Sequence, residues 1–590
     1  MPPEDPSVTT VRLLVRVATD RAGGAGAARA DHAPGPDTDA AAVRALTTRA
    51  LGMLDEAGRP WRIGPLAEGA GPLATYWVVA GAVPALTAYD ASRTAYDLAA
   101  RLAAATGTDV EPDLPSSAFG PEPWTPAGSL SAAGEESFTD PAAHLPGSAP
   151  PTWAVDAVRA QDAWGLTPPA GGRGRGEGAV VASIDTGYTD HPEVAGMYDL
   201  TKDWDAIAGD DDARDPLERP WYLPFTTPGH GTATSSVIGS RAARTILGVA
   251  PLCTVVPIRA VRSVVQVLDG DVARAVETAR RRGCHVISMS LGGRGFFGLQ
   301  EAIRAAVADG IVVMAAAGNK VGVVVAPASY PECLAVAATN ADSRPWQGSS
   351  RGPLVDVSAP GESVWVAAVD RTSGSPTYLE RRASGTSYAV ACLAGVAALW
   401  IAHHGHDAIV ARYGRAQVQA AFLALVRSHG HRVPPGWDEW PVAGSYGVGI
   451  VDAAALLEAG LPPLVEPEVA WAAPAEDAVV RLHAVLTGLD RDEVRAGVAR
   501  LLGVSPAAVD ALPPTAVSEL VYRLGEEDAL RAVVVGTPGP APRASASDMA
   551  GPEVAGPEVD GLALLARTSS RALLVVSPTV ADHLPPKETP

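Results

Sequence analysis

Three short segments of this 590-residue chain carry residue types that could perform nucleophilic chemistry. Asp185 ends the mostly apolar run 180–184, which is typical of a buried strand. His230 stands between two glycines, ahead of small residues that suit a tightly packed helix. Ser387 directly precedes the uncharged, mostly apolar run 388–402, which predicts a buried central helix. An acid, an imidazole and a hydroxyl are together the parts of a nucleophilic triad.

The chemistry of such a triad explains why each residue type is needed. A serine hydroxyl is a weak nucleophile until a neighbouring imidazole takes its proton. A buried carboxylate holds that imidazole in one tautomer and stabilises its protonated form. Asn319 follows the predicted strand 311–317 and could donate its side-chain N–H to a developing oxyanion. A serine at a helix N-terminus also meets the positive end of the helix dipole.

Alternating apolar runs and helical patterns between residues 151 and 462 predict the elements that position these side chains. Five runs have the character of buried parallel strands: Val180–Ile184, Thr254–Ile258, Val286–Ser290, Ile311–Ala317 and Leu334–Ala338. Residues 269–282 and 298–309 predict crossover helices between some of them. The pattern indicates an α/β fold with a doubly wound, mostly parallel sheet. Polar residues at the carboxyl ends of such strands converge on one crevice.

Five segments, in this chain order, resemble the motifs of the subtilisin-like serine peptidases, or subtilases. They are VVASIDTG at 180–187, GHGT at 229–232, SMSLGG at 288–293, AAAGN at 315–319 and SGTSYA at 384–389. The resemblance implies a subtilisin-type fold over 151–462. It also implies the catalytic roles: Asp185 orients, His230 is general base and then acid, Ser387 is the nucleophile and Asn319 is the oxyanion donor. An edge strand would pair with an extended peptide substrate through Ser288, Met289, Ser290, Leu291, Gly292 and Gly293.

The chain departs from the subtilase pattern in two places. The family usually has proline four residues after the nucleophile, where this chain has Ala391, so we expect a straighter helix there. Calcium is the cofactor that the resemblance suggests, but the loop 238–249 after His230 holds no acid or asparagine to bind it. We therefore expect no cofactor and no metal. The stretch 319–330 also holds no acid, which favours a small or apolar P1 residue over a basic one.

Two clusters of metal-ligating residue types leave alternatives open. Six aspartates could surround calcium, although a solvated acidic loop is the favoured interpretation: Asp203, Asp205, Asp210, Asp211, Asp212 and Asp215. Three histidines near the end of the predicted central helix could bind zinc: His403, His404 and His406. Because no carboxylate stands at a matching spacing, a surface helix end is favoured for the histidines.

The N-terminal part predicts a small unit of its own. Residues 1–115 contain expected strands at 9–18 and 74–83 and expected helices at 39–57 and 89–105. This order is similar to that of subtilase propeptides, which implies a propeptide-like α+β unit that assists folding and blocks the cleft with its tail. Residues 116–150 are rich in Pro, Gly and Ser and predict a linker.

The C-terminal part predicts a helical domain at 463–536, followed by a largely disordered tail at 537–590. The apolar residues of the helical domain recur at helical spacing and require burial. A protein partner that docks on these helices and simple packing within the chain satisfy that requirement equally well.

Composition excludes some classes of partner and compartment. The net charge is −20, so the chain has no basic surplus for binding nucleic acid. Glu4 and Asp5 stand near the start, and Arg12 and Arg16 break the first apolar stretch, which is unlike a secretory signal. The run 388–402 is shorter than the ~20 residues that span a bilayer. We expect a cytoplasmic bacterial protein, without a membrane span, whose four cysteines are reduced.

The leading hypothesis is a serine endopeptidase that acts on a dedicated protein or peptide through an acyl-enzyme on Ser387. The alternative is a catalytically silent subtilase scaffold that serves as a binding protein through its C-terminal helices. The sequence leaves open the cleavage motif, the oligomeric state and whether residues 1–115 are removed by self-cleavage.

Overall fold

The architecture comes from a computed structural model of the full chain. The structure describes residues 8–16, 61–67, 71–84, 88–114, 116–117, 149–218, 226–241, 245–264, 266–293, 295–319, 324–370, 375–437, 444–462, 479, 482, 486, 489, 491–512, 514–526 and 528–536. The expected helix over 39–57, the expected tail over 537–590 and most of the expected linker lie outside these residues.

A large sheet forms the centre of the domain that spans the described residues of 149–462, called the central domain below. Within those residues, nine strands follow the order β16-β17-β13-β12-β11-β10-β6-β8-β7. Their bounds are β6 Val180–Asp185, β7 Trp204–Asp205, β8 Thr254–Arg259, β10 Val286–Met289, β11 Val312–Ala316, β12 Leu334–Thr339, β13 Val357–Pro360, β16 His431–Arg432 and β17 Ile450–Val451. Only the β16–β17 pair among them is antiparallel. The mostly parallel sheet confirms the predicted fold class.

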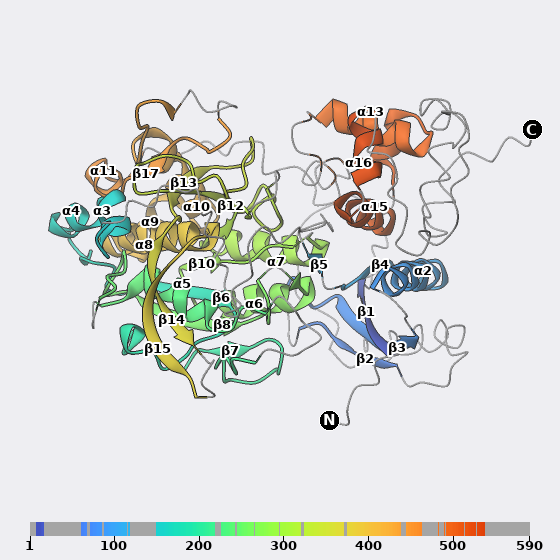
Figure 1. The fold of residues 1–590 in the computed structure, drawn as a ribbon, viewed down its shortest axis with the longest axis horizontal. Helices are drawn as coiled ribbons and strands as arrows, with labels where there is room; N and C mark the ends of the chain where they lie inside the picture. Colours follow the sequence, from blue (N-terminus) through green and yellow to red (C-terminus); the bar gives the residue numbers. More distant parts are fainter. Residues whose placement is uncertain are drawn as a thin grey trace, which may run out of the picture.

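Helices cover both faces of this sheet, as a doubly wound fold requires (Figure 1). One apolar core includes α3 Trp153–Ala157, α4 Ala160–Gly165, α5 His230–Gly239, α8 Thr386–His404, α9 His406–Tyr413, α10 Val418–Ser428 and α11 Ala453–Glu458. The other core includes α6 Asp269–Arg281 and α7 Phe297–Ala308. Side chains buried on both faces explain why the inner strands are continuous apolar runs in the sequence.

Helix α8 runs through the first core and is buried along its whole length. It is long and apolar enough to cross a membrane by composition, yet all of it lies inside the protein. Next to it, the hairpin of β14 (Val364–Asp370) and β15 (Thr377–Ala383) packs against α5.

The N-terminal unit is an antiparallel sheet with one helix. Its strands follow the order β2-β3-β1-β4, with bounds β1 Val8–Arg16, β2 Arg62–Pro65, β3 Tyr76–Pro84 and β4 Asp109–Pro112. Side chains alternate along β1, so Leu13 and Val15 pack toward α2 (Ala88–Thr106). Leu14 points to the opposite face and joins the core that contains α6 and α7.

Polar contacts attach the N-terminal unit to the central domain at the starts of two helices. Asp113 accepts the backbone N–H of Gly270 in the first turn of α6 at 3.3 Å, and Glu111 accepts that of Phe297, the first residue of α7, at 3.2 Å. Carboxylates suit these positions because the first N–H groups of a helix have no partner within it. Arg12 bridges Asp113 at 2.9 Å and Asp271 at 3.0 Å.

The tail of the N-terminal unit continues onto the surface of the central domain. There β5 (Ser116–Ser117) pairs antiparallel with β9 (Gln266–Val267). A short extended segment of the chain therefore already lies on a strand edge of the central domain.

The C-terminal helices form a separate small core. Their bounds are α13 Arg491–Leu502, α14 Pro506–Asp510, α15 Pro514–Glu526 and α16 Asp528–Val535. The side chains at the predicted helical spacing, among them Val494, Val498 and Leu502, are buried together.

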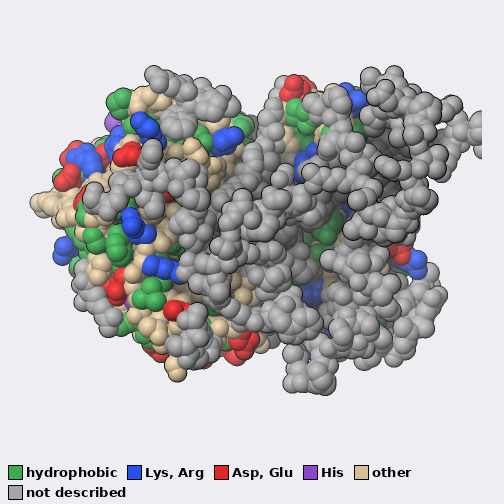
Figure 2. Space-filling model, viewed as in Figure 1, with side chains coloured by type: hydrophobic (Ala, Val, Ile, Leu, Met, Phe, Trp, Pro, Cys, Tyr) green, Lys and Arg blue, Asp and Glu red, His purple; other side chains and the backbone are tan. Residues whose placement is uncertain are grey.

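On the face drawn in Figure 2, acidic and basic side chains are interspersed over the described surface of the central domain.

Candidate active site

Asp185 and His230 form a tightly held pair at the carboxyl edge of the sheet. Asp185 is the last residue of β6, and His230 is the first residue of α5. His230 Nδ1 lies 2.8 Å from Asp185 Oδ1 and 3.0 Å from Oδ2, and both side chains are buried. An ionised carboxylate can only accept, so Nδ1 carries the hydrogen. His230 is thereby held in the tautomer that can take a second proton at Nε2.

Two neighbouring groups hold the carboxylate of Asp185 in place. The backbone N–H of Thr186 donates to Oδ1 at 2.7 Å, and Thr234 Oγ1 donates to Oδ2 at 3.2 Å. Thr234 lies one turn after His230 on α5, so the helix that carries the imidazole also fixes its carboxylate partner.

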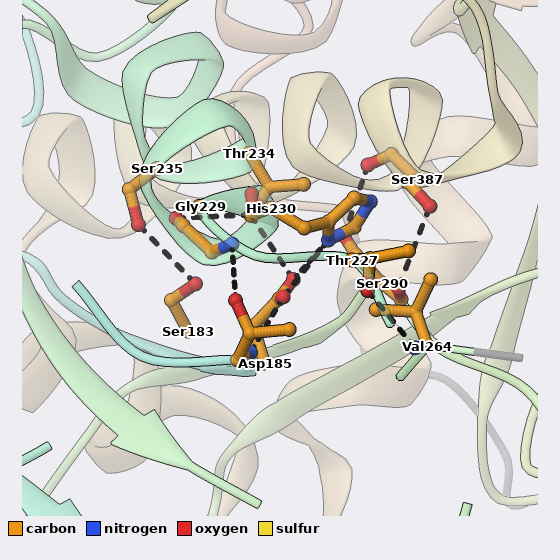
Figure 3. A network of polar contacts seen from close by, with 12 residues as sticks. Ser183, Asp185, Thr227, Gly229, His230, Thr234, Ser235, Val264, Ser290 and Ser387 are labelled. Atoms are coloured by element: carbon orange, nitrogen blue, oxygen red, sulfur yellow. Dashed lines mark hydrogen bonds and ion pairs between the residues drawn. The ribbon is translucent and has the colours of Figure 1, made fainter. Parts of the chain in front are cut away.

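Ser387 lies in the first turn of α8, and His230 stands between Ser387 and Asp185 (Figure 3). The ring of Tyr388, the next residue along the helix, is 6.1 Å from the His230 ring. Ser387 Oγ donates to the backbone oxygen of Ser290 at 3.4 Å, and Ser290 Oγ donates to the backbone oxygen of Ser387 at 3.0 Å. In this conformation the hydroxyl of Ser387 is engaged with Ser290.

Asn319 is fixed by the residue that precedes Ser387. Its Oδ1 accepts the backbone N–H of Thr386 at 2.8 Å and Thr386 Oγ1 at 2.9 Å. Thr386 Oγ1 in turn accepts the backbone N–H of Gly318 at 3.2 Å. Because the amide oxygen is engaged, the N–H groups of Asn319 point the opposite way, as an oxyanion donor requires. The structure thus brings all four predicted catalytic residues to one place.

Asp215 is a positioning residue that the sequence reasoning missed. Its carboxylate accepts Thr186 Oγ1 at 2.8 Å and the backbone N–H groups of Gly229 at 2.7 Å and Leu217 at 2.8 Å. It therefore ties the residue after Asp185 to the residue before His230. Burial raises the pKa of Asp215, and the three donated hydrogen bonds act in the opposite direction. Its place in an acidic run concealed this role, since nothing in the run marks one aspartate as buried.

The expectation of a solvated acidic loop is wrong for three of its six aspartates. Asp203, Asp205 and Asp215 are buried. Asp205 pairs with Arg259, and Asp203 accepts the backbone N–H of Ala213 at 2.8 Å. Among the residues that the structure describes, no three His, Cys, Asp or Glu side chains gather to hold a metal ion. The absence of a cofactor stays a prediction.

The expectation of a surface helix end is also wrong for two of the three histidines, whereas the third, His406 at the start of α9, is half-buried. His403 and His404 are buried, and burial lowers the pKa of both, that of His404 to about 4. The four cysteines, Cys253, Cys284, Cys333 and Cys392, are buried and free of disulfides.

The predicted substrate strand is wrong for its first two residues. Ser288 and Met289 lie in β10, which pairs with β6 on one side and β11 on the other, so they offer no edge. Ser290, Leu291, Gly292 and Gly293 follow the strand, and Gly293 exchanges backbone hydrogen bonds with Ala326 at 2.8 and 3.1 Å. The observed edge that pairs with an extended segment is β9, which the sequence reasoning missed because a two-residue strand has no periodicity.

Comparison with known proteins agrees with this fold and arrangement of side chains, which are those of a serine hydrolase. Residues 176–432 match the Subtilase family. The chain is 32% identical over 256 residues to thermitase of Thermoactinomyces vulgaris, covering 42% of this chain and 82% of thermitase. It is 31% identical over 326 residues to an extracellular protease of Xanthomonas campestris, covering 50% of this chain and only 53% of that protein. The chain belongs to the subtilase family and is a subtilisin-like serine endopeptidase.

A solved structure supports the fold. Fervidolysin from Fervidobacterium pennivorans, described as a keratinolytic enzyme related to subtilisin, aligns with a TM-score of 0.50 at 20% identity. The alignment covers 78% of this chain and 62% of fervidolysin. At this identity the likeness concerns the fold alone.

Proposed function

We propose that this chain cleaves peptide bonds through an acyl-enzyme on Ser387. The Ser387 oxygen attacks the carbonyl carbon while its proton passes to Nε2 of His230, and Asp185 stabilises the imidazolium that results. His230 then gives the proton to the leaving amine as the peptide bond breaks. Water repeats the two steps on the ester, which releases the acid and restores Ser387. The Asp185–His230 hydrogen bond beside Ser387 is the observation that carries this proposal.

The oxyanion of each tetrahedral intermediate would meet two donors. Asn319 offers its side-chain N–H, because its oxygen is held by Thr386. Ser387 offers its backbone N–H, which is among the first N–H groups of α8 and lies at the positive end of the helix dipole. In this family, loss of an oxyanion amide costs about 3 kcal/mol of transition-state stabilisation.

The substrate class that fits this site is an extended peptide. Pairing of β5 with β9 shows that this edge accepts a strand, and an incoming peptide would use the same main-chain hydrogen bonds. A side chain next to the oxyanion donor would lie near Gly318 and Gly292, where Val325 fills the space. Methyl groups of Val325 lie 3.1 Å and 2.3 Å from where a Cβ would stand on Gly318 and Gly292, respectively. This crowding supports a small P1 residue.

The N-terminal unit would act as a propeptide-like inhibitor of the same site. Its tail occupies β9, the edge that the substrate needs, and its carboxylates bind the starts of α6 and α7. A dedicated protein substrate and a cytoplasmic location stay predictions.

The test is the intact mass of the protein with and without a fluorophosphonate probe. We expect one adduct on the native chain, none on Ser387→Ala and one on the control Ser428→Ala, whose side chain is exposed on α10. A native chain of reduced mass, beginning within 110–150, would show self-cleavage of the N-terminal unit. A native chain that stays unlabelled after this unit has been cut off and removed would refute the proposal and favour a silent scaffold.

A further inference from the structure

Helix α15 is buried on its polar side as well as on its apolar side. One side carries Val517, Val521 and Leu524, which belong to the core of the helical domain. The opposite side carries Glu519, which is 0% exposed, and Arg523, which is 2% exposed. A helix at the surface of a small domain normally leaves such a side in water. Another part of the chain must therefore cover it.

The N-terminal unit packs on α15 beside these two residues. Tyr96 of α2 is buried and donates its hydroxyl to the backbone oxygen of Ser518 on α15 at 3.2 Å. The rings of Tyr96 and Tyr522 lie 5.5 Å apart at 54°. Strand β4 packs against α15 as well, and Figure 1 shows α15 directly above α2 and β4. The contact joins parts of the chain that lie more than 400 residues apart (Tyr96 and Ser518 are 422 apart).

Two buried charges lie next to this contact along α15. Glu519 and Arg523 lie one turn apart on α15, with Oε1 and Nε at 3.8 Å. Removing such a pair from water costs free energy that its mutual attraction only partly offsets. Hydration of the two charges therefore favours opening of the contact, whereas packing of the buried Tyr96 against the half-buried Tyr522 favours its closed form.

The opposite surfaces of the N-terminal unit are thus both occupied. Leu14 and Tyr76 pack into the core shared with α6 and α7, while Tyr96 packs on α15. We propose that the helical domain is a binding module whose ligand is the N-terminal unit of the same chain. It holds this unit on the central domain after the linker between them has been cut. The apolar stripes of the helical domain pack against one another, and the polar side of α15 faces the N-terminal unit of the same chain.

The test uses the full chain with Ser387→Ala and the recognition site of a sequence-specific protease inserted within 121–140. After cutting, the release rate of the N-terminal fragment is measured by size-exclusion chromatography at successive times. We expect about tenfold faster release for Tyr522→Ala, which loses the ring contact. Tyr96→Phe loses one hydrogen bond and should release several-fold faster. The control Arg495→Ala, on the exposed side of α13, should leave the rate unchanged.

Tyr96→Phe keeps the ring and therefore the fold, so it carries the test if Tyr522→Ala perturbs the helical domain. Unchanged release in Tyr96→Phe, together with unchanged release in a folded Tyr522→Ala, would overturn the proposal. Immediate release from the parent chain would overturn it as well. Because every chain in the test carries Ser387→Ala, the result does not depend on whether the site is catalytic.

Discussion

Replacing Thr386 by valine would separate the positioning of the oxyanion donor from the nucleophile itself. Valine keeps the shape but removes the hydroxyl, which donates to Asn319 Oδ1 at 2.9 Å and accepts from Gly318 at 3.2 Å. Two lost hydrogen bonds at about 1 kcal/mol each predict about 2 kcal/mol of lost stability. The catalytic loss cannot exceed the ~3 kcal/mol of the whole oxyanion amide. Since the backbone N–H of Thr386 still holds Asn319, we expect about half of that, or roughly a tenfold lower kcat.

The assay is kcat and KM on a chromogenic peptide, with the rate of fluorophosphonate labelling as a second readout. KM should stay nearly constant, because the lost interaction belongs to the transition state. A double-mutant cycle with Asn319→Ala provides the control. If Thr386 acts through Asn319, Thr386→Val should cause no further loss of kcat in the Asn319→Ala background. Equal losses of kcat in both backgrounds would refute this reasoning.

Three further perturbations follow from the structure. Arg12→Ala leaves the carboxylates of Asp113 and Asp271 buried without their shared cation. We therefore expect the free energy of unfolding, measured by denaturant titration, to fall by about 3 kcal/mol. An unchanged denaturation midpoint would contradict this expectation. Asp215→Asn replaces one accepting oxygen by an NH2 group, which can only donate, so at least one of the three hydrogen bonds is lost. It should lower kcat more than it raises KM, because it loosens the loops on both sides of the triad; an effect on KM alone would count against a positioning role. Burial and a stacked histidine neighbour lower the pKa of His285 to about 4. The unfolded chain therefore binds a proton at His285 more tightly than the folded chain does. The stability present above pH 6.5 should fall by up to about 3 kcal/mol as the pH is lowered from 6.5 to 4. His285→Gln should flatten this acid limb of the melting temperature, and an identical pH profile would exclude His285 as its cause.

Most of the sheet was predictable because a buried parallel strand has a local signature. The expected strands at 254–258 and 334–338 are confirmed as β8 and β12 within one residue. The strand expected at 74–83 and the helix at 89–105 correspond to β3 and α2. Apolar continuity and helical spacing are properties of short windows of sequence, so they survive without knowledge of the partners that each element meets.

The candidate site was predictable only for the groups that stand in motifs. Asp185, His230, Asn319 and Ser387 follow strands or start helices, and parallel strands bring such positions together. The roles of Asp215 and β9 depend on contacts between segments that are distant in sequence, and no local pattern encodes them. The same holds for the burial of Glu519, since its own helix gives no sign that a second surface covers it.

Helix α8 has a consequence for the order in which activity is acquired during folding. It is apolar on every side and contacts β10, β11, β12 and β13 as well as α5, so it cannot settle until most of the sheet is in place. Contacts of this long range form late and slowly. The serine at its start reaches His230 only when the helix docks. A nascent or half-folded chain therefore contains Ser387 but has no assembled catalytic triad. It cannot cleave neighbouring proteins until its own folding is complete.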